Sequence, residues 1–261
     1  MARKAAMFFQ RKGYFGDPGA LLLLFLLLSV DCAFIVIHVA TRIERNLLDA
    51  TLQLNYDLLS ITTDGGYPEL YQYVKYFWVI LLTLYLARVA RAPHYVAWTV
   101  LFAYFLCDDA LSIHEKVGAV IGKGLPFVPP LNLRVEDVGE LAVTAMVGGL
   151  LLPLLLWSYR SGSDQFKKIT QDLVLLVLAF VFFGVVVDVA HQSIKLGWVV
   201  EFIMGIIEDG GEMVVLSLIV WFVFLLSVHK GVPGAHLSDL MRRAQNRHPF
   251  EVNSSAFRPA K

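Results

Sequence analysis

Residues 206–228 read IIEDGGEMVVLSLIVWFVFLLSV, in which three acidic side chains precede a long apolar run. The hydrocarbon core of a bilayer is roughly 30 Å thick, so a helix needs about 20 apolar residues to cross it. Backbone groups cannot form hydrogen bonds with lipid, and a helix satisfies them internally. The stretch therefore predicts a membrane-spanning helix with Glu208, Asp209 and Glu212 at its start.

The rest of the chain has the same apolar character. Hydrophobic residues make up 57% of the 261 residues and charged residues only 17%, which is too apolar for a soluble domain of this length. We therefore expect an all-α integral membrane protein in which residues 1–261 form a single transmembrane domain, built as a six-helix bundle. The predicted spans are 19–40, 74–91, 94–113, 138–158, 171–192 and 206–228.

Lysine and arginine are placed unevenly between these spans. Basic residues precede the first span, lie between the second and third and between the fourth and fifth, and follow the sixth. By the positive-inside rule these segments are cytoplasmic, so both termini and the tail 231–261 should be inside. The connections 41–73, 114–137 and 193–205 should then be extracytoplasmic. The formal net charge is zero, which gives no reason to expect a nucleic acid partner.

Two of the extracytoplasmic connections have a recognisable character. In the connection 41–73, apolar residues from Ile43 to Ile61 recur at roughly helical spacing, which predicts a helix lying on the membrane surface. Residues 117–135 contain the Gly- and Pro-rich stretch GKGLPFVPPLNLR, which predicts an ordered loop.

An acidic motif occurs twice. Residues 136–143 read EDVGELAV and residues 208–215 read EDGGEMVV, so E-D-x-G-E-[LM]-x-V opens both the fourth and the sixth span. The preceding spans end similarly, in CDDALSIHEK at 107–116 and VDVAHQSIK at 187–195, each with a carboxylate followed by a histidine. Spans 3–4 and 5–6 are therefore predicted to be hairpins of an internal parallel repeat, related by an axis along the membrane normal.

The predicted topology places all four polar clusters in the extracytoplasmic leaflet. Helical geometry, at about 100° per residue, then selects side chains that face together, such as the i, i+4 pairs Glu136 with Glu140 and Glu208 with Glu212. The candidate site residues are Glu136, Glu140, Glu208, Glu212, Asp188, His191, Asp108, His114 and Glu115. Asp31 and His38, seven residues apart on the first span, and Asp109 are possible additions.

Carboxylates this close to hydrocarbon are costly and need compensation, by protons or by a bound cation. Mixed carboxylate and imidazole ligands suit iron, manganese or zinc. Facing glutamates together with a carboxylate and a histidine one turn apart follow the general pattern of dinuclear carboxylate proteins, although Asp188 and His191 form Asp-x-x-His instead of the usual Glu-x-x-His. The sequence therefore predicts a metal site, with two ions, of divalent iron, manganese or zinc.

Some residues of the repeated motif can instead have purely structural roles. An acid at a helix start, such as Asp137 or Asp209, stabilises the helix dipole. The paired glycines Gly139 and Gly211 permit close approach of neighbouring helices. A second acid one turn further into each helix, Glu140 and Glu212, is not explained by capping.

At DDALSIHEK (108–116) and EDGGEM (208–213) the chain resembles a broad group of uncharacterised bacterial multi-pass membrane proteins. This resemblance implies a bacterial cytoplasmic (inner) membrane and a role for the motif, without indicating a reaction. The chain is also similar, more weakly, to membrane hydrolases of the alkaline ceramidase type, which hold zinc with three histidines and an aspartate. That likeness implies imidazole ligands from His38, His114 and His191, although two histidines on one late helix are absent here.

Three functions fit these observations. The first is a metal-dependent membrane oxidoreductase or hydrolase acting on a lipid-like or quinol-like substrate from the outer leaflet, with a zinc-dependent lipid amide hydrolase as a variant. The second is a cation or proton transporter, against which the inner parts of spans four to six carry no ionisable side chain. The third is a non-catalytic subunit whose helices are held together by a metal. Membrane lipid is the expected partner.

Overall fold

The computed structural model describes residues 17–44, 56–126, 129–130, 133–194 and 197–229. Within these ranges every regular element is helical, as the sequence predicts. The elements are α2 (Pro18–Ile43), α3 (Tyr56–Leu59), α4 (Tyr67–Val89), α5 (Tyr95–Leu111), α6 (Ile113–Lys123), α7 (Val135–Ser161), α8 (Asp164–Val181), the π-helix η3 (Phe182–Val187), α9 (Asp188–Ser193) and α10 (Trp198–Val228).

Five helical segments in this part of the chain are long and apolar enough to cross a membrane, or six if the bent pair α5–α6 counts as one span. The helices α8, η3 and α9 follow one another without a break and make one of the five. Large apolar side chains stand exposed on the outside of the bundle, for example Phe25 at 67% and Leu150 at 75%. This combination indicates a multi-pass membrane protein.

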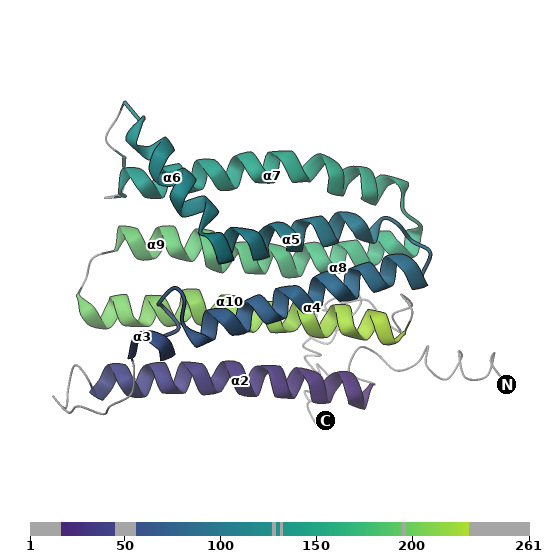
Figure 1. Cartoon of the computed structure of the whole chain (residues 1–261), viewed down its shortest axis with the longest axis horizontal. Helices are drawn as coiled ribbons and strands as arrows, with labels where there is room; N and C mark the ends of the chain where they lie inside the picture. The colour runs from purple at the N-terminus through teal and green to yellow at the C-terminus, as the bar shows by residue number, and fades with distance from the viewer. Residues whose placement is uncertain (1–16, 45–55, 127–128, 131–132, 195–196, 230–261) are drawn as a thin grey trace, which may run out of the picture.

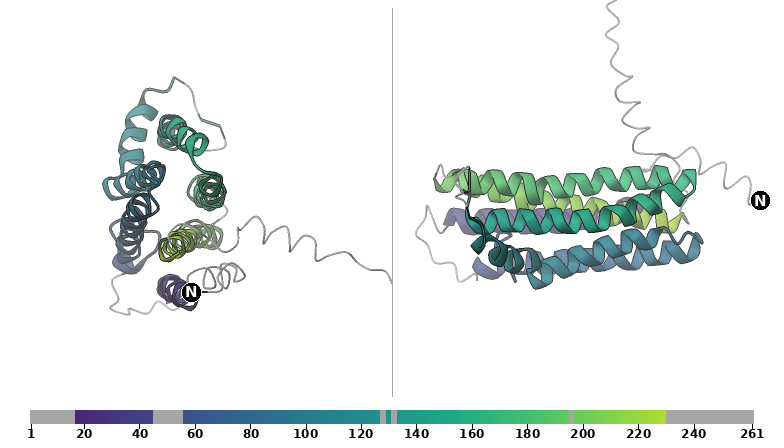
Figure 2. Two further views of the ribbon diagram at one scale, coloured as in Figure 1. Left: turned by 90° about the vertical axis from the view of Figure 1, so that its right-hand side faces the viewer. Right: turned by 90° about the horizontal axis from the view of Figure 1, so that it is seen from above.

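The long helices run side by side (Figure 1). Seen along their axes in Figure 2, α2, α10, α8 and α7 form one row, and α4 and α5 form a second row beside it. The end of α5 with α6, the end of α9, and the starts of α7 and α10 all lie at the left-hand end of Figure 1. The polar ends of four helices therefore meet at one end of the bundle.

Helix α10 lies at the centre of the packing. It contacts α2, α4, α8 and η3. From Met213 onward its side chains are apolar on all sides except for Ser217 and Ser227, and most are buried, with Leu216, Ile219 and Phe222 fully so. A helix that is apolar all round is expected inside the protein, so the run that opened the sequence analysis is the core helix of the fold.

Three helices begin seven or eight residues earlier than the hydropathy pattern predicts, and one of them is α8, which begins at Asp164. Helix α4 begins at Tyr67, and α10 begins at Trp198, directly after Gly197 with a φ of 98°. Hydropathy marks where a segment becomes apolar, whereas a helix begins where the backbone hydrogen bonds begin. As a result Glu208, Asp209 and Glu212 lie well inside α10, so stabilisation of a helix start does not account for Asp209.

The third predicted span, 94–113, ends at a break in the helix. Ser112 has a left-handed φ of 48°, and α5 and α6 meet there at an angle of 71°. Helix α6 continues to Lys123, so the predicted loop over 117–135 is wrong for its first seven residues, 117–123. Glycines in α6 make this possible, because they let the helix lie directly on α7. The predicted surface helix in 41–73 lies mostly outside the described residues, as does the tail 231–261.

Candidate functional site

The break between α5 and α6 is held by a pair of side chains. A carboxylate oxygen of Asp108 lies 3.1 Å from Nδ1 of His114, and the other accepts a hydrogen bond of 2.9 Å from the backbone N–H of His114. The side chain of Ser112 makes no capping hydrogen bond, so Asp108 satisfies a free N–H at the start of α6. Asp108 therefore stabilises the bend and lies next to the imidazole ring.

A second pair joins α9 to α10. Nδ1 of His191 lies 2.6 Å from Oε2 of Glu208. Asp188, one turn before His191, also lies close to the carboxylate of Glu208. His191 and His114 thus contact a carboxylate through the same ring nitrogen, and Nε2 of each ring has no protein hydrogen-bond partner within the described part of the chain.

Further carboxylates connect these pairs. Glu140 on α7 lies near both His114 and Asp188, close enough to interact with their charges. Glu212 on α10 likewise lies close enough to Asp109 on α5 and to Asp188 to interact with their charges. The predicted convergence of α5, α7, α9 and α10 is therefore present, and Asp109, a secondary candidate from the sequence, is among its inner members.

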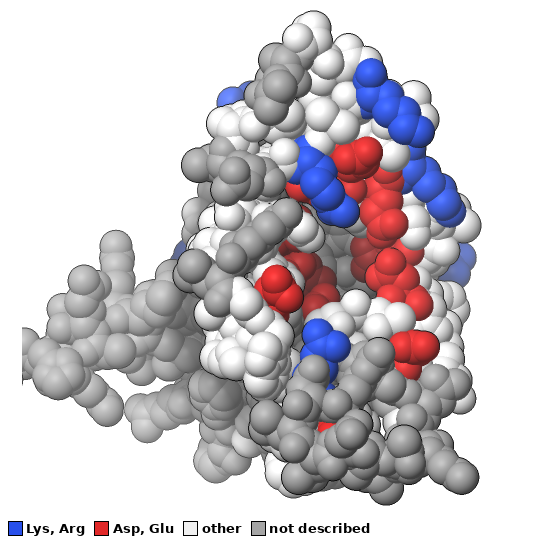
Figure 3. Space-filling view, turned by 90° about the vertical axis from the view of Figure 1, so that its left-hand side faces the viewer, with Lys and Arg blue, Asp and Glu red and all other residues white. Residues whose placement is uncertain are grey.

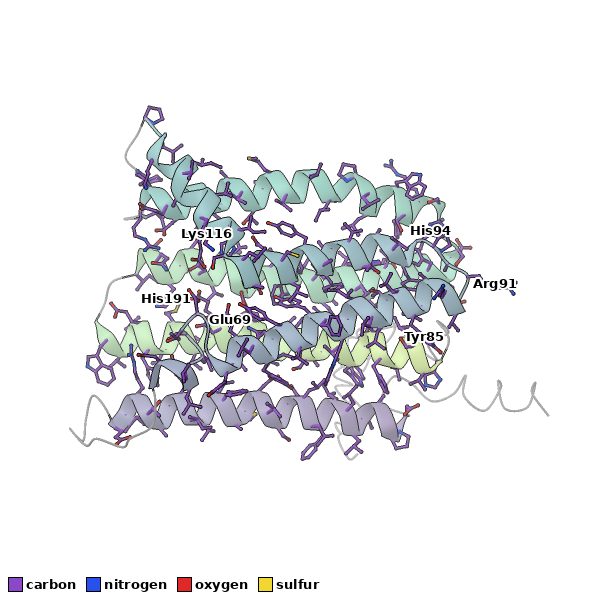
Figure 4. The ribbon with its side chains drawn as sticks, in the orientation of Figure 1. Glu69, Tyr85, Arg91, His94, Lys116 and His191 are labelled. Atoms are coloured by element: carbon purple, nitrogen blue, oxygen red, sulfur yellow. The ribbon has the colours of Figure 1, made fainter. Side chains whose placement is uncertain are left out.

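Acidic side chains surround an open hollow at this end of the bundle. Figure 3 shows Asp and Glu side chains gathered around a depression in the end face of the bundle. The side chains of Asp108, Asp109, Glu140, Asp188, Glu208, Asp209 and Glu212 are all partly exposed. Figure 4 shows Glu69, Lys116 and His191 at this end, while Arg91 and His94 lie at the opposite end. The hollow is therefore accessible from the end of the bundle that carries the repeated motif.

Aromatic side chains form the floor of the hollow. Phe105, Phe180 and Tyr76 meet in pairs with ring centroids 5.6 to 6.4 Å apart. Tyr76 is 1% exposed, and its hydroxyl faces the carboxylates of Asp109 and Glu212. Around and below these rings the bundle core combines apolar side chains with buried polar ones, among them Lys75, Thr83 and Thr99. The floor separates the acid-lined hollow from the middle of the bundle.

The repeated glycines bring helices together. A Cβ at Gly139 would fall on the backbone of Gly118 in α6, and one at Gly211 would fall on the ring of Phe183 in η3. In both copies of the motif the glycine therefore packs against the preceding helix of its hairpin, which is the structural role that its small size predicts.

Other acids of the motif have simpler roles. Asp137 accepts hydrogen bonds from the backbone and the guanidinium of Arg134, at 2.6 to 2.9 Å, so it caps α7 as the structural explanation predicts. Glu136 is partly exposed in the first turn of α7, and Glu115 is exposed on α6. Asp108 and Glu115 lie on different helices, α5 and α6, because Ser112 breaks the helix between them.

The first span places its polar residues elsewhere. Asp31 is fully buried and lies 3.0 Å from Nζ of Lys75 on α4, an ion pair that the sequence analysis missed. A signal existed, because an acid in the middle of a span needs a partner and Lys75 lies within the predicted second span. Nδ1 of His38 lies 3.2 Å from Oγ of Ser60.

Metal binding requires side chains to move. Within the described residues, His, Cys, Asp and Glu side chains do not form any group of three or more in positions that could hold a metal ion together. The donor atoms that metals prefer are nevertheless present around one partly exposed hollow. The fit to a metal is thus one of donor chemistry, which rotation about side-chain bonds would have to complete.

Fold and site define an all-helical, multi-pass membrane protein with an acid-lined hollow at one end of its bundle. The chain belongs to the family described as Domain of unknown function (DUF8692), which matches residues 20–228. The match runs from the start of α2 to the end of α10 and contains both copies of the motif. No curated protein and no solved structure is similar enough to this chain to match it.

Proposed function

We propose that this protein is a metal-dependent membrane enzyme whose acid-lined hollow binds divalent metal ions, two of them in the complete site. One observation carries the proposal: Nδ1 of His191 forms a hydrogen bond of 2.6 Å with Glu208 and Nδ1 of His114 lies 3.1 Å from Asp108, while Nε2 of each ring has no protein partner within the described residues. A carboxylate that holds the far nitrogen of a metal-binding histidine is the usual arrangement in metalloproteins, because it fixes the ring and makes Nε2 a better ligand.

The acids would have two roles: some would orient the histidine rings and others would bind the metal. Asp108 and Glu208 already contact Nδ1, so they would orient the rings. Metal ligands would then come from Nε2 of the two histidines and from the carboxylates that connect them, Glu140, Asp188 and Glu212. Iron, manganese or zinc would suit this mixture of nitrogen and oxygen donors.

A bound metal would supply an activated water for hydrolysis, or, as an iron pair, redox chemistry. The protein itself would orient the imidazoles and supply the aromatic floor on which an apolar substrate could rest. A lipid-like or quinol-like molecule suits a hollow that joins carboxylates to aromatic rings at a membrane surface. We place the hollow on the extracytoplasmic side of a bacterial inner membrane, in a six-helix bundle with both termini inside and a parallel repeat of two hairpins.

The aromatic floor favours catalysis over transport of cations or protons. A transport path usually shows ionisable side chains through the membrane. Here Tyr76, Phe105 and Phe180 lie beneath the acids. The ionisable side chains Asp31 and Lys75 are buried in the spans as a pair bonded to each other, instead of forming a chain of such groups across the membrane. A non-catalytic subunit held by a metal would not require the open hollow that Figure 3 shows.

Removing one carboxylate from each copy of the motif should abolish metal binding. We expect the purified wild type to carry near-stoichiometric iron, manganese or zinc, and the double variant Glu140→Gln with Glu212→Gln to carry none, because both changes remove a charged oxygen donor while keeping side-chain size. Elemental analysis of protein purified without chelators measures this. Circular dichroism checks that both proteins remain helical.

The matched control is Glu201→Gln with Asp164→Asn, which removes two exposed carboxylates outside the hollow. It should retain the metal of the wild type. A wild type without bound metal, or a double variant that retains it, would contradict the proposal.

A further inference from the structure

Glu212 packs against a glycine of the neighbouring helix. A Cβ built on Gly184 would fall on Oε1 of Glu212, and the next nearest atoms outside the local helix backbone, at 3.1 and 3.9 Å, are the Cδ and Cγ of the same side chain. Gly184 belongs to the π-helix η3, the turn directly before Asp188. The carboxylate of Glu212 therefore occupies the space that a side chain at residue 184 would fill.

The first copy of the motif shows the same relation. A Cβ built on Gly118 in α6 would fall on Cγ of Glu140, and also on its backbone N and Cα. Both of the inner glutamates, Glu140 and Glu212, thus lie over a glycine of an adjacent helix. The two contacts differ in one respect. The atoms nearest to a Cβ at Gly118 include backbone atoms of α7, whereas the three nearest to a Cβ at Gly184 all belong to the Glu212 side chain.

The surrounding helix geometry makes Gly184 unusual. Glycine lowers helix stability relative to alanine, so a helix interior gives no local reason for it. The π-helix is a rare, wider turn that is frequent at functional sites. Here glycine and π-helix occur together, opposite Glu212 and next to Asp188.

We propose that Gly184 is a positioning residue, whose missing side chain seats the Glu212 carboxylate between η3 and α10 and so directs it toward the hollow. The inference rests on the proposed function in one respect, because the seated carboxylate is one of the metal ligands named there. A Cβ at residue 184 would displace the carboxylate and leave the backbone contacts of η3 in place.

Gly184→Ala tests this by separating metal binding from stability. We expect metal affinity to fall by about tenfold or more, the range found when a residue supporting a ligand is lost. The midpoint of thermal unfolding in detergent should not fall, because alanine favours the helix and meets only a movable carboxylate. Gly148→Ala is the control: its Cβ meets nothing within 4 Å, so it gains the same helix preference and should keep wild-type affinity for Zn²⁺ or Mn²⁺.

A second measurement does not depend on metal. A water-soluble carbodiimide, read out by mass spectrometry, should modify Glu212 several-fold faster in Gly184→Ala than in the wild type, while Glu208 reacts at an unchanged rate. Equal rates at Glu212 together with unchanged metal affinity would overturn the inference. If the wild type binds no metal but Glu212 is labelled faster in Gly184→Ala, the positioning role of Gly184 would be supported and the proposed function contradicted.

One further variant covers the case in which Gly184→Ala folds poorly. Adding Glu212→Asp shortens the side chain by one methylene, so the carboxyl carbon takes the place of the present Cγ, 3.9 Å from the new Cβ, and an oxygen can reach at most the region of the present Cδ, 3.1 Å away. We expect the double variant to recover the unfolding midpoint of the wild type. A double variant as unstable as Gly184→Ala would show that residue 184 acts on the backbone, and would overturn the inference.

Discussion

Lys75→Met should lower the free energy of unfolding by about 3–5 kcal/mol, the usual cost of removing one partner of a buried ion pair. Nζ of Lys75 is completely buried and lies 3.0 Å from Asp31, 2.9 Å from the carbonyl oxygen of Met213 and 3.3 Å from Oγ of Ser217. Oγ of Ser217 in turn donates to Asp31 at 2.5 Å. Unfolding in mixed micelles, induced by sodium dodecyl sulfate and followed by circular dichroism, measures the loss.

The cost arises mainly from the charge that is left behind. Lys75 joins α2, α4 and α10, and without it the carboxylate of Asp31 would remain buried with only the hydroxyl of Ser217. The double variant Asp31→Leu with Lys75→Met removes both charges and should recover most of the lost stability, because apolar side chains often replace a buried pair without loss. If the double variant is as unstable as the sum of the single variants, the two side chains act independently.

Gly139→Ala should be strongly destabilising, by about 3 kcal/mol or more, which is the upper range for overpacking. Its Cβ would fall on the carbonyl group of Gly118, and backbone cannot rotate away as a side chain can. The two helices would have to separate, and α6 would lose its main contact. The same denaturation experiment measures the effect.

Gly149→Ala, in the same helix, provides the comparison. Its Cβ meets nothing within 4 Å, so the substitution should stabilise the protein by about 0.5–1 kcal/mol through helix preference alone. A Gly139→Ala protein that matches Gly149→Ala in stability would show that α6 and α7 do not pack through Gly139.

The proposed metal site rests on both the sequence and the tertiary structure. The repeated motif identified Glu140 and Glu212 as acids that helix capping does not explain. Since α10 begins at Trp198, earlier than predicted, Glu212 lies further inside its helix than the sequence indicated. Asp137 illustrates the opposite outcome. The contacts of Asp137 with Arg134 are those of a helix cap. A single sequence does not tell an acid that caps a helix from an acid that belongs to a site.

By itself the sequence determined that the chain is helical and spans a membrane several times, because apolar runs of this length leave the backbone no other way to satisfy its hydrogen bonds. It also determined that four polar helix ends would meet at one end of the bundle. Only the tertiary structure decided the pairing of Asp31 with Lys75, the break at Ser112 and the choice of Glu208 as the partner of His191. These depend on how each helix is rotated against its neighbours, and that rotation is set by side-chain contacts far apart in the chain.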